Sequence, residues 1–381
     1  MPLDQQLLGT KLKRYREQFE LTMAEVSRAT GISEAFLERY EQGLATPSGD
    51  EILIFADFYK CDFKFFISNE KLAPFEETAT LFRRYGNEFS KRDRWAVQEF
   101  LFLAECEHFL QDALHRLPNT IFTYSKTASA GKQHGSEAAL SLRRYLDYSD
   151  LEVRLDIYRD LRAIGLHVFR RKLQNSNISG LYVRHPVAGD CVLINYNEDI
   201  YRQRFTAAHE AAHAILDWQD HLIVSFRNDN ETREVQANKF ASNYLVPNTF
   251  LHGIPQPRNW NQQKAVEWAN KLKVSTEALA YALKRARLIN TATVELIKAV
   301  RVPKKDKVDP EIPSTLTPQS RERKISLLER GLSTYYVNLC FEGYRSGLAS
   351  AARLAEMLLV ETDAELRTLA SLYGEHLQYG S

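Results

Sequence analysis

The run from Arg202 to Leu216 most constrains the fold, because it contains no glycine or proline and is rich in alanine. Such a composition predicts a helix. Within this run, His209, Glu210 and His213 form an HExxH pattern. Residues four positions apart lie on the same face of a helix, so we expect the two imidazoles one above the other, with the Glu210 carboxylate beside the first.

This combination of side chains points to a particular chemistry. Two neutral imidazoles can bind one zinc ion, and a neighbouring carboxylate can act as general base toward a water molecule. We therefore take His209 and His213 as candidate zinc ligands and Glu210 as the candidate catalytic base. The alternative is a chance pattern on an ordinary amphipathic helix, which the surrounding sequence must exclude.

A catalytic zinc site needs a third protein ligand. Glu234 follows His213 by 21 residues and begins another run of helical periodicity, which extends to Pro247. A carboxylate there would complete a His2Glu ligand set, as in gluzincin metalloproteases. Asn238 lies one turn later, and its amide is expected to support Glu234. Asp229 and Glu231 are competing ligands, and Glu234 could alternatively be a solvated charge at a helix start.

Short strands are predicted ahead of the motif helix. Residues 136–147 and 151–163 have helical periodicity, and three β-branched or aromatic runs follow, Leu166–Arg170, Gly180–Arg184 and Cys191–Tyr196. Their apolar side chains alternate with period two, so one face of the sheet should pack on helices. The fold class predicted for this region is a small mixed sheet packed on the HExxH helix, within a chain that is otherwise mostly α-helical.

The N-terminal segment has the pattern of a helix-turn-helix. Thr22 and Glu25 form a capping box, Gly31 supplies the turn, and Ser33 is expected to cap a second helix. The candidate DNA contacts of this second helix are Ser33, Ala35 and Arg39.

Charge argues for a second interpretation of the same unit. Residues 1–70 contain 8 Lys and Arg against 12 Asp and Glu, and the second helix carries Glu34, Glu38 and Glu41. Acidic groups repel the phosphates that dominate affinity for DNA. The helix-turn-helix could therefore serve protein contact or dimerisation instead.

These motifs resemble two known families. The stretch LTMAEVSRATGIS…LERYEQGLATPS is similar to the XRE-type (Cro/repressor) helix-turn-helix domain, over about residues 6–68. The stretches GLYV, INYN, RFTAAHEAAHAIL and EVQANKFASNYLVP resemble the ImmA/IrrE family of metallopeptidases, over about residues 150–250. The second resemblance implies that His209, His213 and Glu234 bind zinc and that Glu210 is the catalytic base.

The ImmA/IrrE resemblance also implies a class of substrate. Known members act on DNA-binding repressors and relieve repression under stress or during induction of mobile elements. Two departures stand out in this chain. Ala211-Ala212 replaces the usual Leu-Gly, and Asp217 stands where a histidine is often found four residues past the second ligand.

The segment after the motif is basic. Residues 258–305 hold 11 Lys and Arg against 3 Glu, and residues 262–287 again have a helix, turn, helix pattern. Lys284 and Arg285 are its candidate DNA contacts, and a basic solvated helical hairpin is the alternative. Residues 309–320 contain three prolines and are predicted to be a linker. Residues 321–373 are predicted to be helical, with a leucine-rich stripe that would form a core or a homodimer seam.

Composition and length set the remaining expectations. The chain has 381 residues, 44% hydrophobic and 26% charged, with four scattered cysteines and no apolar signal segment. We expect a cytoplasmic protein with no membrane partner and no disulfide framework. The predicted division is 1–70 (helix-turn-helix), 71–135 (helical connector and linker), 136–250 (zincin-like metallopeptidase), 251–308 (basic helical segment) and 309–381 (C-terminal helical domain).

Together the patterns predict a zinc-dependent endopeptidase with DNA-binding modules that cleaves a helix-turn-helix repressor. One zinc ion per chain is expected, and manganese is an alternative because His2Glu sites accept several divalent ions. The competing hypothesis is a DNA-binding regulator, or an antitoxin-like protein, whose zincin-like domain senses or binds without proteolysis.

Overall fold

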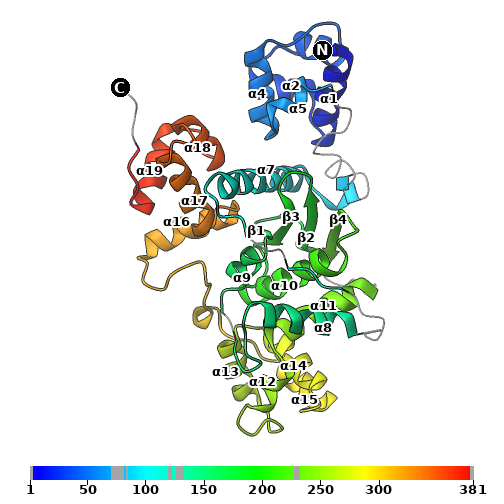
Figure 1. The fold of residues 1–381 in the computed structure, drawn as a ribbon, viewed down its shortest axis with the longest axis vertical. Helices are drawn as coiled ribbons and strands as arrows, with labels where there is room; N and C mark the ends of the chain where they lie inside the picture. The colour runs from blue at the N-terminus through cyan, green and yellow to red at the C-terminus, as the bar shows by residue number, and fades with distance from the viewer. Residues whose placement is uncertain are drawn as a thin grey trace.

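The computed structural model describes residues 3–69, 81–82, 85–118, 122–125, 133–153, 155–226 and 232–377. The chain is mostly α-helical with one small mixed sheet, which confirms the predicted fold class (Figure 1). Among the described residues, no helix is long and apolar enough to cross a membrane.

Five helices make up the N-terminal unit at the top of Figure 1. They are α1 (Gln5–Gln18), α2 (Met23–Thr30), α3 (Glu34–Glu41), α4 (Gly49–Tyr59) and α5 (Phe63–Ile67). The predicted capping box of Thr22 and Glu25 is present, and Gly31 has φ +76°, as its turn requires. Ser33 stands at the N-cap of α3, but its hydroxyl makes no capping hydrogen bond.

The sheet has four strands in the order β1-β3-β2-β4. They are β1 (His167–Arg171), β2 (Ile178–His185), β3 (Gly189–Asn195) and β4 (Leu222–Phe226). β1 pairs with β3 in parallel, and β2 pairs antiparallel with both β3 and β4. The sequence pattern had predicted three of these strands and missed β4, which follows the motif helix and forms one edge.

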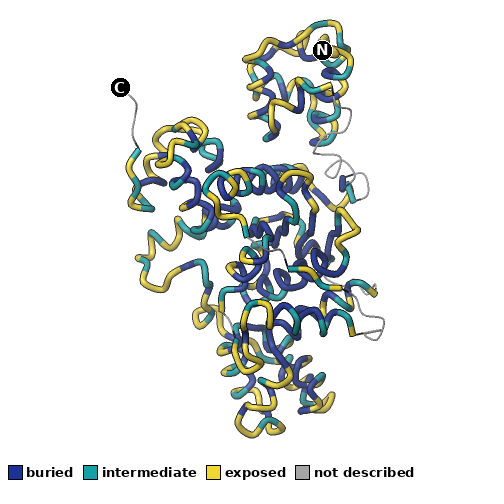
Figure 2. Tube along the Cα trace, in the orientation of Figure 1, coloured by how far each residue is buried: buried dark blue, intermediate teal, exposed yellow. Residues whose placement is uncertain are grey.

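Both faces of the sheet are buried, so the prediction of a single covered face is too narrow (Figure 2). Tyr182 and Val192 belong to the core formed with the motif helix α10 (Ile200–Leu216). Leu181 and Leu193 instead join a second core with α7 (Lys91–Ala113). Helix α7, predicted only as part of a connector, therefore packs on the second face of the sheet, where it contacts β1 and β3.

The helices on the α10 side continue well past the motif. They are α8 (His134–Tyr145), α9 (Ile157–Ala163), α11 (Thr232–Leu245), α12 (Asn248–His252), α13 (Gln262–Leu272), α14 (Thr276–Arg285) and α15 (Thr291–Lys298). Buried residues of α13, α14 and α15 share one hydrophobic core with α10 and α11. Helix α8 begins inside the predicted linker, of which residues 126–132 lie outside the described part of the chain.

The C-terminal helices pack on the opposite side, with α7. They are α16 (Pro318–Glu329), α17 (Thr334–Arg345), α18 (Ala351–Met357) and α19 (Asp363–Tyr373), shown from orange to red in Figure 1. Their buried residues share the second core with α7, as predicted for a helical region with a packed leucine stripe.

The predicted linker of residues 309–320 is held at its start by Arg170. Arg170, at the end of β1, binds Asp309 through two nitrogens, at 2.8 and 3.0 Å, and Glu311 through its Nε at 2.8 Å. Its Nη1 also donates to Gln203 on α10 at 3.1 Å. Because the Arg170 side chain is only 1% exposed, this buried network fixes the linker against both the sheet and the motif helix.

Candidate metal centre

Three side chains with metal-binding atoms meet between two helices. His209 and His213 lie one turn apart on α10, and Glu234 lies in the first turn of α11. Their ligand atoms all lie within 4.8 Å of one another. The His209 Nε2 is 2.9 Å from Glu234 Oε2 and 3.2 Å from His213 Nε2. Two imidazoles and a carboxylate facing one point fit a divalent ion such as zinc.

Alanine explains how α10 and α11 come so close. Ala207, Ala208, Ala211 and Ala212 are fully buried on α10. Side chains this small allow the helix to pack closely against the sheet and α11 at once. The Ala211-Ala212 pair therefore serves close packing of the helix.

The outward nitrogen of each imidazole is held by a neighbouring polar group. Asn238 Oδ1 lies 3.1 Å from His209 Nδ1, and Asp217 Oδ2 lies 2.9 Å from His213 Nδ1. These contacts turn both Nε2 atoms toward Glu234. Asn238 thus orients His209, whereas the sequence had suggested that it supports Glu234. Asp217, noted only as a departure from the family pattern, is a second orienting group.

The protonation of each residue in this cluster depends on the hydrogen bonds and charges of the others. Burial opposes the charged form of His213, but hydrogen bonds to Asp217 and Glu234 outweigh it and raise the pKa of His213 to about 9. Burial likewise disfavours the Glu234 carboxylate, yet hydrogen bonds from His209 and His213 lower the pKa of Glu234 to about 2. A divalent ion would take the place of the proton that these groups share.

Glu210 lies beside this cluster in a tightly packed place. The residue is fully buried, and neither carboxylate oxygen accepts a hydrogen bond of ordinary geometry from the described residues. Burial raises the pKa of Glu210, and the charges of His209 and His213 oppose that shift. A buried carboxylate with few partners and a raised pKa has the properties of a general base.

Gly180 on β2 provides the space for Glu210, a role that the sequence analysis missed. A Cβ at position 180 would lie 2.8 Å from Glu210 Oε1 and 2.9 Å from the Leu193 carbonyl oxygen. The available signal was a glycine at the start of a predicted strand, since a strand glycine often marks a close approach of another group.

Other predicted residues lie apart from this centre. The competing ligands Asp229 and Glu231 fall outside the described residues. The candidate DNA contacts Ser33, Ala35 and Arg39 are exposed on or beside α3, with Glu34 and Glu38 on the same helix. Glu41, in contrast, is partly buried, and the guanidinium of Arg16 donates to its carboxylate at 2.7 and 2.8 Å.

The two basic candidates of α14 differ from each other. Lys284 is exposed. The Arg285 guanidinium instead donates to the Val246 carbonyl at 2.7 Å, to Asn248 Oδ1 at 3.0 Å and to the Ser242 hydroxyl. Burial lowers the pKa of Arg285 to about 10. Arg285 therefore holds α14 against the end of α11, a structural use of its guanidinium that the prediction of a DNA contact had not included.

Comparison with known families agrees with this arrangement. Residues 161–284 match the IrrE N-terminal-like domain, a peptidase family, and residues 7–62 match a helix-turn-helix domain. No curated protein and no solved structure matched the chain. The chain thus combines a metallopeptidase-type domain with a DNA-binding type of domain. More particularly, the predicted resemblance to ImmA/IrrE metallopeptidases with an XRE-type helix-turn-helix is confirmed, and the peptidase match extends beyond residue 250 to include α12, α13 and α14.

Proposed function

We propose that this chain is a zinc-dependent endopeptidase that cleaves a DNA-binding repressor. The observation that carries the proposal is the meeting of His209, His213 and Glu234 beside the buried carboxylate of Glu210. These three residues would hold one divalent ion, zinc or manganese. Such an ion, when bound, supplies Lewis-acid polarisation of a carbonyl group and lowers the pKa of water.

Residues of this chain orient the metal ligands and transfer the proton. Asn238 and Asp217 keep the two imidazoles turned toward the ion. Glu210 takes a proton from the attacking water on a carboxylate oxygen and returns it to the leaving amine. Its burial supports both steps, because burial raises the pKa of Glu210 and so strengthens the carboxylate as a proton acceptor.

The sheet offers a place for an extended substrate. In the described sheet β4 is an edge strand, and it lies in sequence between α10 and α11, the two helices that carry the metal-binding side chains. A peptide in extended form could add to that edge through backbone hydrogen bonds. We therefore propose that the scissile segment of the substrate is extended when it is cleaved.

The helix-turn-helix domain suggests that the peptidase encounters its substrate at DNA. A domain of this type at residues 7–62 would bring the peptidase to DNA or to a protein bound there. Its acidic α3, with exposed Glu34 and Glu38, favours a protein contact over close phosphate contacts on that face. A helix-turn-helix repressor is accordingly the proposed substrate, in the cytoplasm.

Two substitutions test the catalytic assignment. Glu210→Gln is expected to retain one zinc ion per chain, measured by elemental analysis, and to lose cleavage of a repressor encoded beside the gene. Glu234→Gln removes a ligand and is expected to lose both the metal and cleavage. Undiminished cleavage by Glu210→Gln would overturn the role of Glu210, whereas bound zinc without any cleavage by the unaltered protein would favour a non-proteolytic regulator.

A further inference from the structure

Ser225, on the edge strand β4, lies on the same side of the sheet as Glu210. Gly180 on β2 and Ser225 on β4 are paired directly across the two antiparallel strands. Side chains at such paired positions point to the same face of a sheet. A Cβ at Gly180 would lie 2.8 Å from Glu210 Oε1, so this face is the one that α10 covers. The Ser225 side chain therefore points toward α10 and Glu210.

The neighbours of Ser225 along β4 agree with this placement. Ile223 belongs to the core formed with α10, whereas Val224 belongs to the core formed with α7. Because the side chains of a strand alternate between its two faces, Ser225 shares the face of Ile223. Two independent observations thus place the Ser225 hydroxyl on the α10 side.

Ser225 and Glu210 are both buried and both lack an ordinary hydrogen bond. Ser225 is 3% exposed and Glu210 is fully buried. Neither the serine hydroxyl nor the carboxylate makes a hydrogen bond of ordinary geometry with the described residues. Burial raises the pKa of Glu210, and the Ser225 hydroxyl is among the groups close enough to lower it. A buried donor and a buried acceptor that face each other in this way are expected to bond to each other.

The other side-chain donors around Glu210 already have partners. Thr206 lies one turn earlier on α10, and its hydroxyl donates to Glu198 at 2.8 Å. The two imidazoles of the metal centre are held at Nδ1 and direct their Nε2 atoms toward Glu234. Within the described part of the chain, Ser225 is therefore the hydroxyl available to the Glu210 carboxylate.

We propose that Ser225 is a positioning residue for Glu210, an inference that rests on the proposed role of Glu210 as general base. The serine hydroxyl donates to one carboxylate oxygen and leaves the other oxygen to accept the proton of the attacking water. Hydrogen bonds in a catalytic site commonly tighten when the substrate binds. Because Ser225 lies on the strand edge proposed for the extended substrate, a peptide bound along β4 would fix Ser225 and, through it, Glu210.

Steady-state cleavage by the full-length protein supplied with zinc tests this role. Ser225→Ala is expected to lower kcat about tenfold or more, the effect of one hydrogen bond to a charged group, and to leave KM and zinc content unchanged. Ser225→Cys keeps a side chain of similar size but only a weak donor, so it should lose activity as Ser225→Ala does. Full activity in Ser225→Ala or in Ser225→Cys would overturn the proposal.

Thermal unfolding gives a second readout that does not depend on cleavage. Ser225→Ala is introduced both into the unaltered chain and into the Glu210→Gln background. Its effect on Tm should be more unfavourable in the unaltered chain, because a hydrogen bond to a carboxylate is stronger than one to an amide. Equal Tm effects in the two backgrounds would overturn the contact. If the unaltered protein cleaved no repressor, the proposed function would fail, and this comparison would still decide whether Ser225 holds Glu210.

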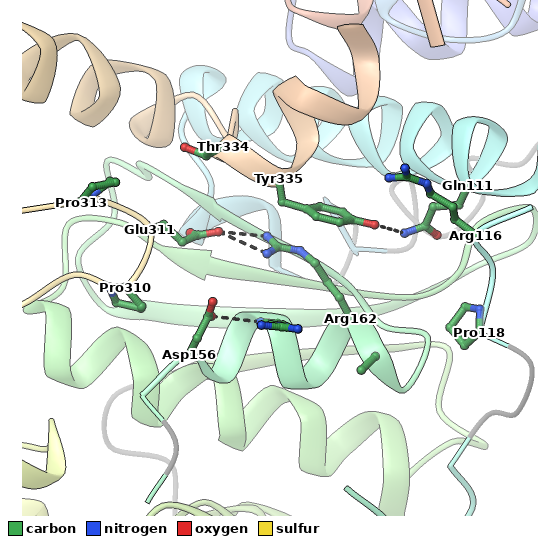
Figure 3. Close-up of a pocket in the computed structure, with 12 residues that line it drawn as sticks. Gln111, Arg116, Pro118, Asp156, Arg162, Pro310, Glu311, Pro313, Thr334 and Tyr335 are labelled. Atoms are coloured by element: carbon green, nitrogen blue, oxygen red, sulfur yellow. Dashed lines mark hydrogen bonds and ion pairs between the residues drawn. The ribbon is translucent and has the colours of Figure 1, made fainter. Parts of the chain in front are cut away.

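The control is Tyr335→Phe, which removes a hydroxyl from a cavity lined by residues that the metal centre does not use (Figure 3). The Tyr335 hydroxyl accepts a hydrogen bond from Gln111 at 3.0 Å. Tyr335→Phe should leave kcat unchanged and should shift Tm equally with and without Glu210→Gln, because distant sites act additively. A loss of kcat in Tyr335→Phe as large as that in Ser225→Ala would overturn the specific role of Ser225.

Discussion

Replacing Gly180 with alanine tests how closely the sheet and the motif helix fit around Glu210. Gly180 lies on β2 and faces α10, across from the carboxylate. The added Cβ would lie 2.8 Å from Glu210 Oε1, 2.9 Å from the Leu193 carbonyl oxygen and 2.9 Å from Thr206 Cγ2. Ordinary contacts of a Cβ begin at 3.4 Å, so each of these three is about half an ångström too short.

The expected magnitude follows from what would have to move. The Leu193 oxygen is a backbone atom of the neighbouring strand β3, and the Thr206 side chain is held by the hydrogen bond that its hydroxyl donates to Glu198 at 2.8 Å, so neither atom can move away freely. Separating β2 from α10 to relieve the overlap should cost about 1–3 kcal/mol of folding free energy. For a domain of this size, that corresponds to a fall in Tm of about 2–12 °C. Glu210 would also be displaced, and a shift of about 1 Å in a catalytic group can reduce the rate about 100-fold.

Thermal unfolding, zinc content and repressor cleavage would be measured on the same preparations. Gly49→Ala is the matched control, because a Cβ at that helix position meets nothing within 4 Å. Its effect on stability should stay within about 0.5 kcal/mol. Gly180→Ala should retain its zinc, because the atoms nearest the added Cβ belong to Glu210, Leu193 and Thr206 and to none of the three metal-binding side chains. An unchanged Tm together with full cleavage in Gly180→Ala would refute the tight contact between β2 and Glu210.

Three further substitutions have defined expectations. Asp217→Asn should weaken zinc affinity about 10–100-fold, measured by competition with a chelator, because His213 loses the carboxylate that orients it; unaltered affinity would contradict this. Glu311→Ala should cost about 3–5 kcal/mol in denaturant unfolding, because buried Arg162 and Arg170 each lose a carboxylate partner and Arg170 keeps only Asp309 among its described acidic partners. Removing the half-exposed Glu329 should cost less than about 1 kcal/mol. Burial disfavours the charged form of Glu311, but the charges of Arg170 and Arg162 outweigh it and lower the pKa of Glu311. The stabilisation from this ion pair is therefore present above the pKa of Glu311 in the unfolded chain and is lost as pH falls through its pKa in the folded chain. Glu311→Ala should lack this acid-dependent loss of stability. Arg285→Ala should lower stability, with no specific effect on DNA affinity in a salt titration, because its guanidinium binds α11 and α12.

Local patterns predicted the parts of this protein whose cause is local. The alanine-rich HExxH helix and the capping box of Thr22 and Glu25 follow from spacings of three or four residues, and both are present. Glu234 was chosen from its place at the start of a helix, and the structure brings it to His209 and His213. Periodicity of two likewise predicted three of the four strands.

Other features depend on contacts between distant segments, which no local spacing encodes. The second sheet face is buried against α7, and α7 ends more than 50 residues before β1 begins. The role of Gly180 depends on the approach of α10, and that of Arg285 on where α11 ends. The pairing of Arg170 with Asp309 and Glu311 spans about 140 residues of sequence.

The sequence by itself therefore determined which side chains are available for chemistry and which helices carry them. Tertiary packing decided which outer groups orient the imidazoles, how much space surrounds Glu210, and which charges are buried in ion pairs. The physical reason is that helix formation and capping are set within a few residues, whereas close approach and desolvation depend on elements that meet only in the folded chain.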